Sequence, residues 1–324
     1  MSRLKEIKKP IESHLKEFQK VFRKTARSKV YLLDIITKYI LKSKGKQIRP
    51  LFVIYSAALF DNVSPSTYRA ASLIELMHTA TVVHDDVVDD SMQRRGRFSI
   101  NALWKNKVAV LVGDYLLSRG LLLALENKDY QLLEIVSKAV KDMSEGELLQ
   151  IEKARKLDID EEVYYEIIRQ KTASLLASCF AAGSASAEVD EAQVEKMHRI
   201  GELAGLAFQI KDDLFDFQKT SITGKPTGID IKEKKMTLPL IYLLNNSSAA
   251  EKRKMINIVK RHNNDRKKVE WLMDKVNSSG GMKYAEQKMN SFKDEALSLL
   301  SEFPDNQARK ALADLIEYSI VRKK

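Results

Sequence analysis

Residues 79–90 read Thr-Ala-Thr-Val-Val-His-Asp-Asp-Val-Val-Asp-Asp, an acidic cluster inside an apolar run with the pattern of a helix. A second stretch of the same kind occupies residues 200–217. Six aspartates repeat the spacing Asp-Asp-x-x-Asp: Asp85, Asp86, Asp89 and Asp212, Asp213, Asp216. On a helix, positions i and i+4 share one face and position i+1 lies about 100° away. Each cluster is therefore expected to be a compact array of carboxylate oxygens.

Close carboxylates repel one another unless a cation offsets their charge. Solvated helix faces also carry aspartate pairs, but both clusters here interrupt apolar sequence, so partial burial is expected, and a buried charge needs a partner. Oxygen ligands favour hard divalent ions, and Mg²⁺ is commonly shared between carboxylates and the phosphates of a substrate. Two such arrays on facing helices predict a magnesium cage for a diphosphate.

The rest of the chain predicts an all-α fold. Only 12 Gly and 6 Pro occur among 324 residues. Apolar residues recur every three to four positions, and no run of alternating strands with turn signals is present. The composition does not change sharply anywhere, so residues 1–324 are expected to form a single domain.

The formal net charge is +11, with basic residues concentrated in residues 3–29 and 252–268. These stretches are either solvated helix faces or surfaces that attract anionic substrates or an anionic membrane. Nucleic acid is not expected as a partner, because aromatic residues are not interleaved with the basic ones. The one cysteine, Cys179, is expected to be buried. No segment is expected to stay apolar for ~18 residues, which favours a cytoplasmic protein.

A diphosphate site also needs cations, because Arg can bind phosphate oxygens in a bidentate pair and Lys acts as a point charge. Candidates lie at predicted loops, among them residues 94–99 after the first acidic cluster, and at helix ends, and each alone would be an ordinary surface cation. Together with the two acidic clusters they predict one shared site. The candidates are Lys46, Arg49, Arg94, Arg95, Lys171, Lys225 and Lys235.

With these motifs the chain resembles the trans-isoprenyl diphosphate synthases, the head-to-tail prenyltransferases, from about residue 30 onward. The resemblance implies the isoprenoid synthase fold, a bundle of roughly ten or more helices around a central substrate cavity. One departure is Lys234, where the family usually has Gly before the lysine that corresponds to Lys235. The matching segments are Gly45–Pro50, His84–Asp89, Arg94–Gly96, Gly113-Asp114, Lys171-Thr172, Phe208–Asp216, Gly224–Pro226 and Thr237–Leu240.

The resemblance implies an enzyme that joins isopentenyl diphosphate to an allylic diphosphate, with roughly three Mg²⁺ ions per active site neutralising the leaving diphosphate. The six aspartates would hold the metal. The allylic diphosphate would bind Arg94, Lys171, Lys225 and Lys235 or its neighbour Lys234. Thr172 would help to hold the allylic cation by its dipole. Isopentenyl diphosphate would bind Lys46, Arg49, His78, Arg95, Phe208 and Gln209. The released diphosphate is expected to remove the proton. His78 could be a core histidine and not a substrate ligand.

Chain length in the family depends on residues one to three turns before the first aspartate. Here these are Ala80, Thr81 and Met77, none of them aromatic, so the tunnel is expected to be open. We therefore expect a long-chain product in the heptaprenyl to nonaprenyl range, with octaprenyl favoured. Products of this kind are used for quinone side chains. If Phe180 or Met143 closes the tunnel, a geranylgeranyl or farnesyl product is expected instead. A homodimer and a peripheral membrane contact for product release are also expected.

Three other functions are compatible with parts of the sequence. A non-catalytic subunit of a heteromeric synthase usually loses the acidic motifs, and both are kept here. A metal phosphohydrolase built on His84 and Asp85 would need further histidine ligands, and the other four are not suitably spaced. A terpene cyclase would not be expected to carry cations for a second diphosphate, such as Lys46, Arg49 and Arg95.

Overall fold

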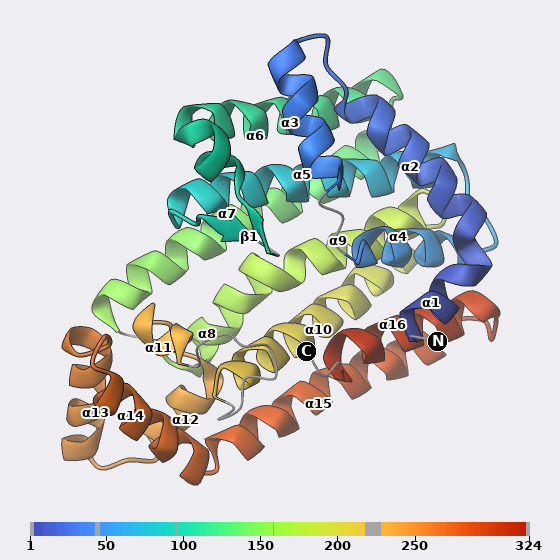
Figure 1. The fold of residues 1–324 in the computed structure, drawn as a ribbon. Helices are drawn as coiled ribbons and strands as arrows, with labels where there is room; N and C mark the ends of the chain where they lie inside the picture. Colours follow the sequence, from blue (N-terminus) through green and yellow to red (C-terminus); the bar gives the residue numbers. More distant parts are fainter. Residues whose placement is uncertain (1–2, 43–45, 95, 158, 218–227, 322–324) are drawn as a thin grey trace. The chain divides into compact units, whose positions relative to one another are not determined.

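The computed structural model describes residues 3–42, 46–94, 96–157, 159–217 and 228–321 (Figure 1). The chain divides into two compact units, each described here by itself. The first comprises residues 1–140, 178–198 and 303–315; the second comprises residues 141–177, 199–302 and 316–324. The expectation of a single domain over residues 1–324 stays a prediction.

The first unit is helical apart from one small β-ribbon. Its elements are α1 (Arg3–Lys8), a 3₁₀ turn (Lys9–Ile11), α2 (Glu12–Ala26), α3 (Tyr31–Lys42), α4 (Ile48–Ala58), α5 (Pro65–Val88), β1 (Gln93–Arg94), β2 (Arg97–Phe98), α6 (Ile100–Glu126) and the first part of α7 (Tyr130–Lys156). Most of α9 (Ser174–Ala185) and the first turns of α10 (Glu191–Asp216) and α16 (Gln307–Val321) complete it.

The second unit is helical throughout the residues that the structure describes. It holds the remaining parts of α7, α10 and α16 and the start of α9. Its other elements are α8 (Glu161–Ile168), a π-helical turn (Arg169–Ala173), α11 (Ile229–Lys232), α12 (Leu238–Asn245), α13 (Ala249–Arg261), α14 (Arg266–Ser278) and α15 (Gly281–Ser301). The short apolar helix α12 packs on α13, α14 and α15 and forms the core at this end of the unit.

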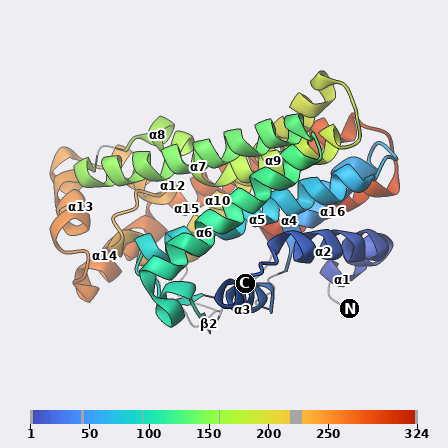
Figure 2. The same cartoon turned by 90° about the horizontal axis from the view of Figure 1, so that it is seen from above.

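Helix α5 is the centre of the first unit. It packs along α6 and also contacts α2 and α4, and α5 and α6 lie side by side in both views (Figure 1 and Figure 2). The close approach depends on a residue without a side chain, because a Cβ built at Gly113 would lie 2.1 Å from Nε2 of His84. The start of α5 is fixed by a capping box between Ser64 and Thr67, with Pro65 at the first helical position.

The all-α prediction is confirmed, and three local expectations were wrong. Residues 94–99, expected as a loop, include a two-stranded antiparallel ribbon in which Gln93 pairs with Phe98. The first acidic helix begins much earlier than expected, at Pro65, and the second at Glu191. By length and composition alone α6 could cross a membrane. This is weak evidence for a membrane span, because core helices of soluble proteins meet the same criterion.

Candidate active site

The first unit contains a pocket of about 230 Å³. One face of α5 forms a wall of it, at positions 75, 78, 79, 82, 83 and 86, which are spaced three to four residues apart as a single helix face requires. Arg49 at the start of α4, Arg94 of the ribbon and the second half of α3 form other parts of the lining. The pocket therefore brings together His78, Asp86, Arg49 and Arg94, four of the residues predicted from the sequence.

Asp86 and Arg94 contact each other in this pocket. The Arg94 Nε–H donates a hydrogen bond of 2.7 Å to Oδ1 of Asp86, whose side chain is buried. Arg94 follows Asp86 by eight residues in the sequence. The charge of the buried carboxylate is therefore balanced within one short segment. A predicted metal ligand and a predicted diphosphate ligand are thus paired with each other.

The remaining aspartates of the first cluster are less buried than expected. Asp85 is exposed at the end of α5, and Asp89 lies just beyond the helix, with φ of −85° and ψ of 0°. The expectation that all three belong to one helix was therefore wrong for Asp89. Its backbone N–H still donates a hydrogen bond of 2.8 Å to the carbonyl of Asp85.

The predicted isopentenyl-diphosphate residues begin at the segment before α4. Lys46 is exposed, and its backbone carbonyl accepts a hydrogen bond of 2.8 Å from Nζ of Lys8. Gln47 then adopts the left-handed conformation, with φ of 51°, which is uncommon for a residue with a side chain. Arg95 and Lys225, two further predicted cations, lie outside the described residues.

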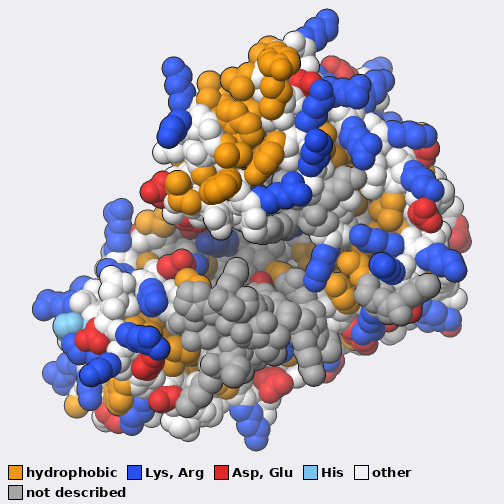
Figure 3. Space-filling model, in the orientation of Figure 1, with side chains coloured by type: hydrophobic (Ala, Val, Ile, Leu, Met, Phe, Trp, Pro, Cys, Tyr) orange, Lys and Arg blue, Asp and Glu red, His pale blue; other side chains and the backbone are white. Residues whose placement is uncertain are grey.

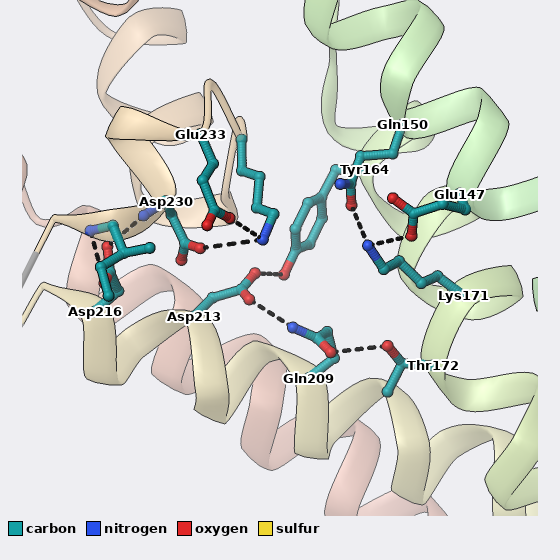
Figure 4. A network of polar contacts seen from close by, with 12 residues as sticks. Glu147, Gln150, Tyr164, Lys171, Thr172, Gln209, Asp213, Asp216, Asp230 and Glu233 are labelled. Carbon is teal, nitrogen blue, oxygen red and sulfur yellow. Dashed lines mark hydrogen bonds and ion pairs between the residues drawn. The ribbon is translucent and has the colours of Figure 1, made fainter. Parts of the chain in front are cut away.

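In the second unit, a chain of hydrogen bonds runs from α8 to the second acidic cluster (Figure 4). The hydroxyl of Tyr164 donates to Oδ2 of Asp213 at 2.8 Å. Gln209, one turn earlier on α10, donates to Oδ1 of Asp213 at 2.8 Å, and its own Oε1 accepts from the hydroxyl of Thr172 at 2.8 Å. Both oxygens of the buried Asp213 carboxylate are thereby held in place.

The third aspartate of this cluster has a structural role as well. Oδ1 of Asp216 accepts from the backbone N–H of Ile229 and Oδ2 from that of Asp230, each at 3.0 Å. The side chain thus satisfies two amides at the start of α11, which would otherwise lack partners. Asp216 joins the end of α10 to the segment that carries Asp230.

Asp230 is close to this cluster and was not predicted. Its pKa is raised to about 8, first by burial and then by the charges of Asp213 and Asp216. The pKa of Asp213 is raised to about 6, because the effect of burial outweighs that of the hydrogen bonds from Tyr164 and Gln209, which lower it. Lys235 offsets part of the negative charge: its Nζ lies 3.9 Å from Asp230 and 2.5 Å from Glu233.

Lys171 occupies the π-helical turn, where the regular helix is interrupted. Its Nζ forms an ion pair with Glu147 of α7 and donates to Oε1 of Gln150 at 3.3 Å (Figure 4). A Cβ at Gly146 would lie 2.8 Å from the Lys171 amide nitrogen, so α7 can approach this turn only because residue 146 is glycine. The lysine and its acidic partner therefore have defined positions.

Mg²⁺ would suit the donor set of the second cluster. Among the described residues no three carboxylate, histidine or cysteine side chains converge as a ready-made metal site. However, Asp213 and Asp230 have raised pKa values because they are buried close to other carboxylates. A bound divalent cation would relieve that crowding, and all the side-chain donors are oxygens. The residues present fit the ion in chemistry.

The residues predicted to set product length are buried or half-buried on α5. Ala80 is fully buried, and Met77 packs toward α6, where its Cε would lie 3.3 Å from a Cβ at Gly120. None of Ala80, Thr81 and Met77 lines the pocket that contains Asp86. Phe180, named as an alternative block, packs against Phe52 with ring centroids 5.0 Å apart. The assignment of these residues to a tunnel stays a prediction.

Four residues in the second unit were not predicted. Tyr164, Glu147 and Gln150 contact predicted site residues from other helices, and no spacing rule links them to α10 or to residue 171. Asp230 lies in the charged stretch Asp-Ile-Lys-Glu-Lys-Lys at residues 230–235, which resembles a solvated loop.

Comparison with known proteins identifies the family of the chain. The sequence model of the family described as Polyprenyl synthetase matches residues 30–276. Octaprenyl diphosphate synthase of Escherichia coli is 33% identical over 296 residues, which are 91% of this chain and 91% of that protein. The crystal structure of a decaprenyl diphosphate synthase from Rhodobacter capsulatus has a TM-score of 0.93 at 31% identity and covers 99% of this chain and 100% of that one. The structure of geranylgeranyl pyrophosphate synthase from Bacteroides thetaiotaomicron has a TM-score of 0.84 at 36% identity, covering 99% and 100%.

Proposed function

The chain belongs to the polyprenyl synthetase family and is a trans-prenyltransferase, and from that premise we propose that it makes a long-chain all-trans polyprenyl diphosphate. The reaction is the Mg²⁺-dependent, head-to-tail condensation of isopentenyl diphosphate with an allylic diphosphate. The observation that carries the proposal is the pocket shared by Asp86, Arg94, Arg49 and His78. An acidic side chain beside two arginines and a histidine suits a diphosphate bound with a metal ion better than an uncharged substrate.

The reaction breaks the allylic C–O bond and forms a C–C bond to the terminal alkene carbon of isopentenyl diphosphate. Negative charge grows on the leaving diphosphate while the allylic carbon becomes cationic. Arg94, Lys171 and Lys235 are the described cations that we assign to the leaving group. Arg94 and Lys171 are held by carboxylates in this structure, so substrate would exchange one anionic partner for another.

Asp85, Asp86, Asp89, Asp212, Asp213 and Asp216 are the proposed ligands of Mg²⁺, which when bound would neutralise the diphosphate and strengthen it as a leaving group. Tyr164 and Gln209 position the carboxylate of Asp213 by occupying one lone pair on each oxygen. Asp230 extends the ligand set because it lies beside Asp213 and Asp216.

Isopentenyl diphosphate is assigned to Lys46, Arg49 and His78, with Phe208 and Gln209 close to its hydrocarbon end. A bidentate contact from Arg49 would orient the diphosphate and leave the alkene free to react. The proton lost after the C–C bond forms would pass to the released diphosphate, so no side-chain base is assigned.

A product in the heptaprenyl to nonaprenyl range is proposed, with octaprenyl favoured and quinone side chains as its use. The small residue Ala80 and the names of the octaprenyl and decaprenyl relatives support a long chain. The likeness to a geranylgeranyl pyrophosphate synthase supports the shorter alternative. Chromatography of dephosphorylated products made from isopentenyl and farnesyl diphosphate tests the proposal. Long all-trans polyprenols are expected; a product that stops at geranylgeranyl favours the alternative, and the absence of any elongation favours a non-catalytic subunit.

A homodimer is proposed because α6 exposes a row of aliphatic side chains on one helix. Val110, Leu111, Leu121, Leu122 and Leu125 are all exposed, and such a row is typical of a surface that another protein covers. A second copy of the chain is its proposed partner, and light scattering of the purified protein tests it. We further propose that residues 1–324 act as one domain in the cytoplasm and that the product leaves through a peripheral membrane contact.

A further inference from the structure

Helix α3 carries an exposed apolar cluster that the proposed chemistry does not use. Tyr31 is 81% exposed and Val30, just before the helix, is 62% exposed. Leu32 and Ile35 are also exposed. Hydrophobic side chains accordingly gather over α3 in the space-filling view, with basic side chains around them (Figure 3). Large apolar side chains grouped in this way usually mark an interaction surface.

The opposite side of α3 already has its packing partners. Ile36 and Thr37 are buried, and the ring of Tyr39 meets Trp104 of α6 at a centroid distance of 5.4 Å. The hydroxyl of Tyr39 donates to the backbone carbonyl of Phe98 at 2.7 Å. The helix is therefore attached to the unit by one face and presents the apolar cluster on another.

Basic residues border this cluster. Between residues 24 and 42 the only acidic residue is Asp34, which is paired with Lys38 at 2.6 Å. A groove next to α3 is lined by four basic side chains, Arg23, Arg27, Lys38 and Lys42, together with Asp34, Thr37 and Leu41. We name the following residues the α3 face: Lys24, Arg27, Lys29, Val30, Tyr31, Leu32, Ile35, Lys38 and Lys42, of which all five basic members are exposed.

We propose that the α3 face binds the surface of an anionic phospholipid bilayer. Tyr31, Leu32 and Val30 would enter the boundary between headgroups and acyl chains, and the basic side chains would contact headgroup phosphates. An apolar insertion combined with a basic patch supplies the two contributions that stable peripheral binding needs. The proposal deepens the membrane contact of the proposed function by giving it a location.

A second copy of the chain is a poorer partner for this face than a bilayer. A two-fold symmetric contact places a surface against itself. Here that would bring five basic side chains against five others, with only Asp34 to offset them, and like charges across an interface are costly. The aliphatic row on α6 has charges of both signs on its own helix, Lys107, Asp114 and Glu126 among them, and is the better self-contact.

Flotation of the full-length protein with lipid vesicles tests the proposal without substrate, so its outcome does not depend on catalysis. Vesicles of phosphatidylcholine alone are compared with vesicles that also contain phosphatidylglycerol. We expect binding to the anionic vesicles to be about tenfold tighter and to weaken with salt. Equal binding to both vesicles, or to neither, would overturn the proposal.

Two variants with matched controls locate the binding surface. Tyr31→Ser/Leu32→Ser and Lys24→Glu/Lys29→Glu should each lower vesicle affinity about tenfold. Their controls, Leu148→Ser/Ile151→Ser on α7 and Lys252→Glu/Lys260→Glu on α13, make matching changes at other exposed sites and should retain binding. If a control variant loses as much vesicle affinity as the α3 variant that it matches, the vesicle contact is not at α3. If the α3 variants change only the mass seen by light scattering, the face joins copies of the chain and the proposal fails.

Discussion

The hydroxyl of Tyr164 donates a hydrogen bond of 2.8 Å to Oδ2 of Asp213, and both side chains are buried. Burial, together with the charge of Asp213, keeps the pKa of Tyr164 well above its usual value, so the phenol remains a donor. The pair links α8 to the second acidic cluster and fixes the orientation of one carboxylate in it.

Replacing Tyr164 by phenylalanine tests that link. Tyr164→Phe should cost about 1–2 kcal/mol of unfolding free energy, because a buried carboxylate oxygen loses its donor. It should also lower turnover about tenfold and weaken Mg²⁺ binding measured by calorimetry. Tyr165→Phe is the matched control, since its hydroxyl contacts Glu161 and not the cluster. Equal turnover in the two variants would show that the Tyr164 hydroxyl does not position Asp213 for the reaction.

Arg94 and Arg49 line the same pocket and are assigned to different substrates. Arg94→Ala should raise the KM for the allylic diphosphate about tenfold, and Arg49→Ala should do so for isopentenyl diphosphate, because each removes a charged phosphate contact. Steady-state kinetics with each substrate varied in turn measures both. The reverse pattern would exchange the two assignments.

The contact between α5 and α6 at Gly113 can be tested by adding one methyl group. Gly113→Ala should destabilise the fold by about 1–3 kcal/mol, because the new Cβ would overlap the His84 ring. His84→Ala removes that ring, so the double variant should recover much of the loss in urea denaturation. Additive losses would mean that the helix backbones, rather than the ring, limit the approach.

Ala80 is the proposed first gate for product length. It lies five residues before Asp85 and is fully buried. Ala80→Phe should shorten the main product to a few isoprene units while the first condensation survives, because no proposed diphosphate ligand changes. Chromatography of dephosphorylated products measures this. An unchanged long product at full activity would show that Ala80 does not face the growing chain.

Local sequence patterns were sufficient for the fold class, and they selected four residues that the structure places in one pocket. The spacing of apolar residues predicted helices, and Asp86, His78, Arg49 and Arg94 were found together in one pocket. Asp89 was misplaced because the helix period continues past Val88, while the backbone turns at Asp89 and reaches a left-handed residue at Asp90. Periodicity alone does not mark such an end when no glycine or proline follows.

Contacts between helices distant in the chain were beyond those patterns. The partners of Lys171 and Asp213 lie on α7 and α8. These contacts arise from helix packing, and no fixed spacing in the sequence predicts them. Asp230 becomes a candidate site residue only in the structure, where the hydrogen bond from its backbone N–H to Asp216 holds the start of α11 at the end of α10. The chemistry of single residues was readable from the sequence, and their neighbours were not.

Both acidic clusters are proposed to act with Mg²⁺ in one condensation. Incorporation of labelled isopentenyl diphosphate tests this proposal most directly, using the wild type, Asp85→Asn and Asp212→Asn at saturating Mg²⁺ and the wild type after chelation. Each variant and the chelated enzyme should lose about a hundredfold or more of the turnover, because transition-state charge goes unbalanced, while circular dichroism stays unchanged. Near-normal turnover in either variant, or in the chelated enzyme, would contradict the account.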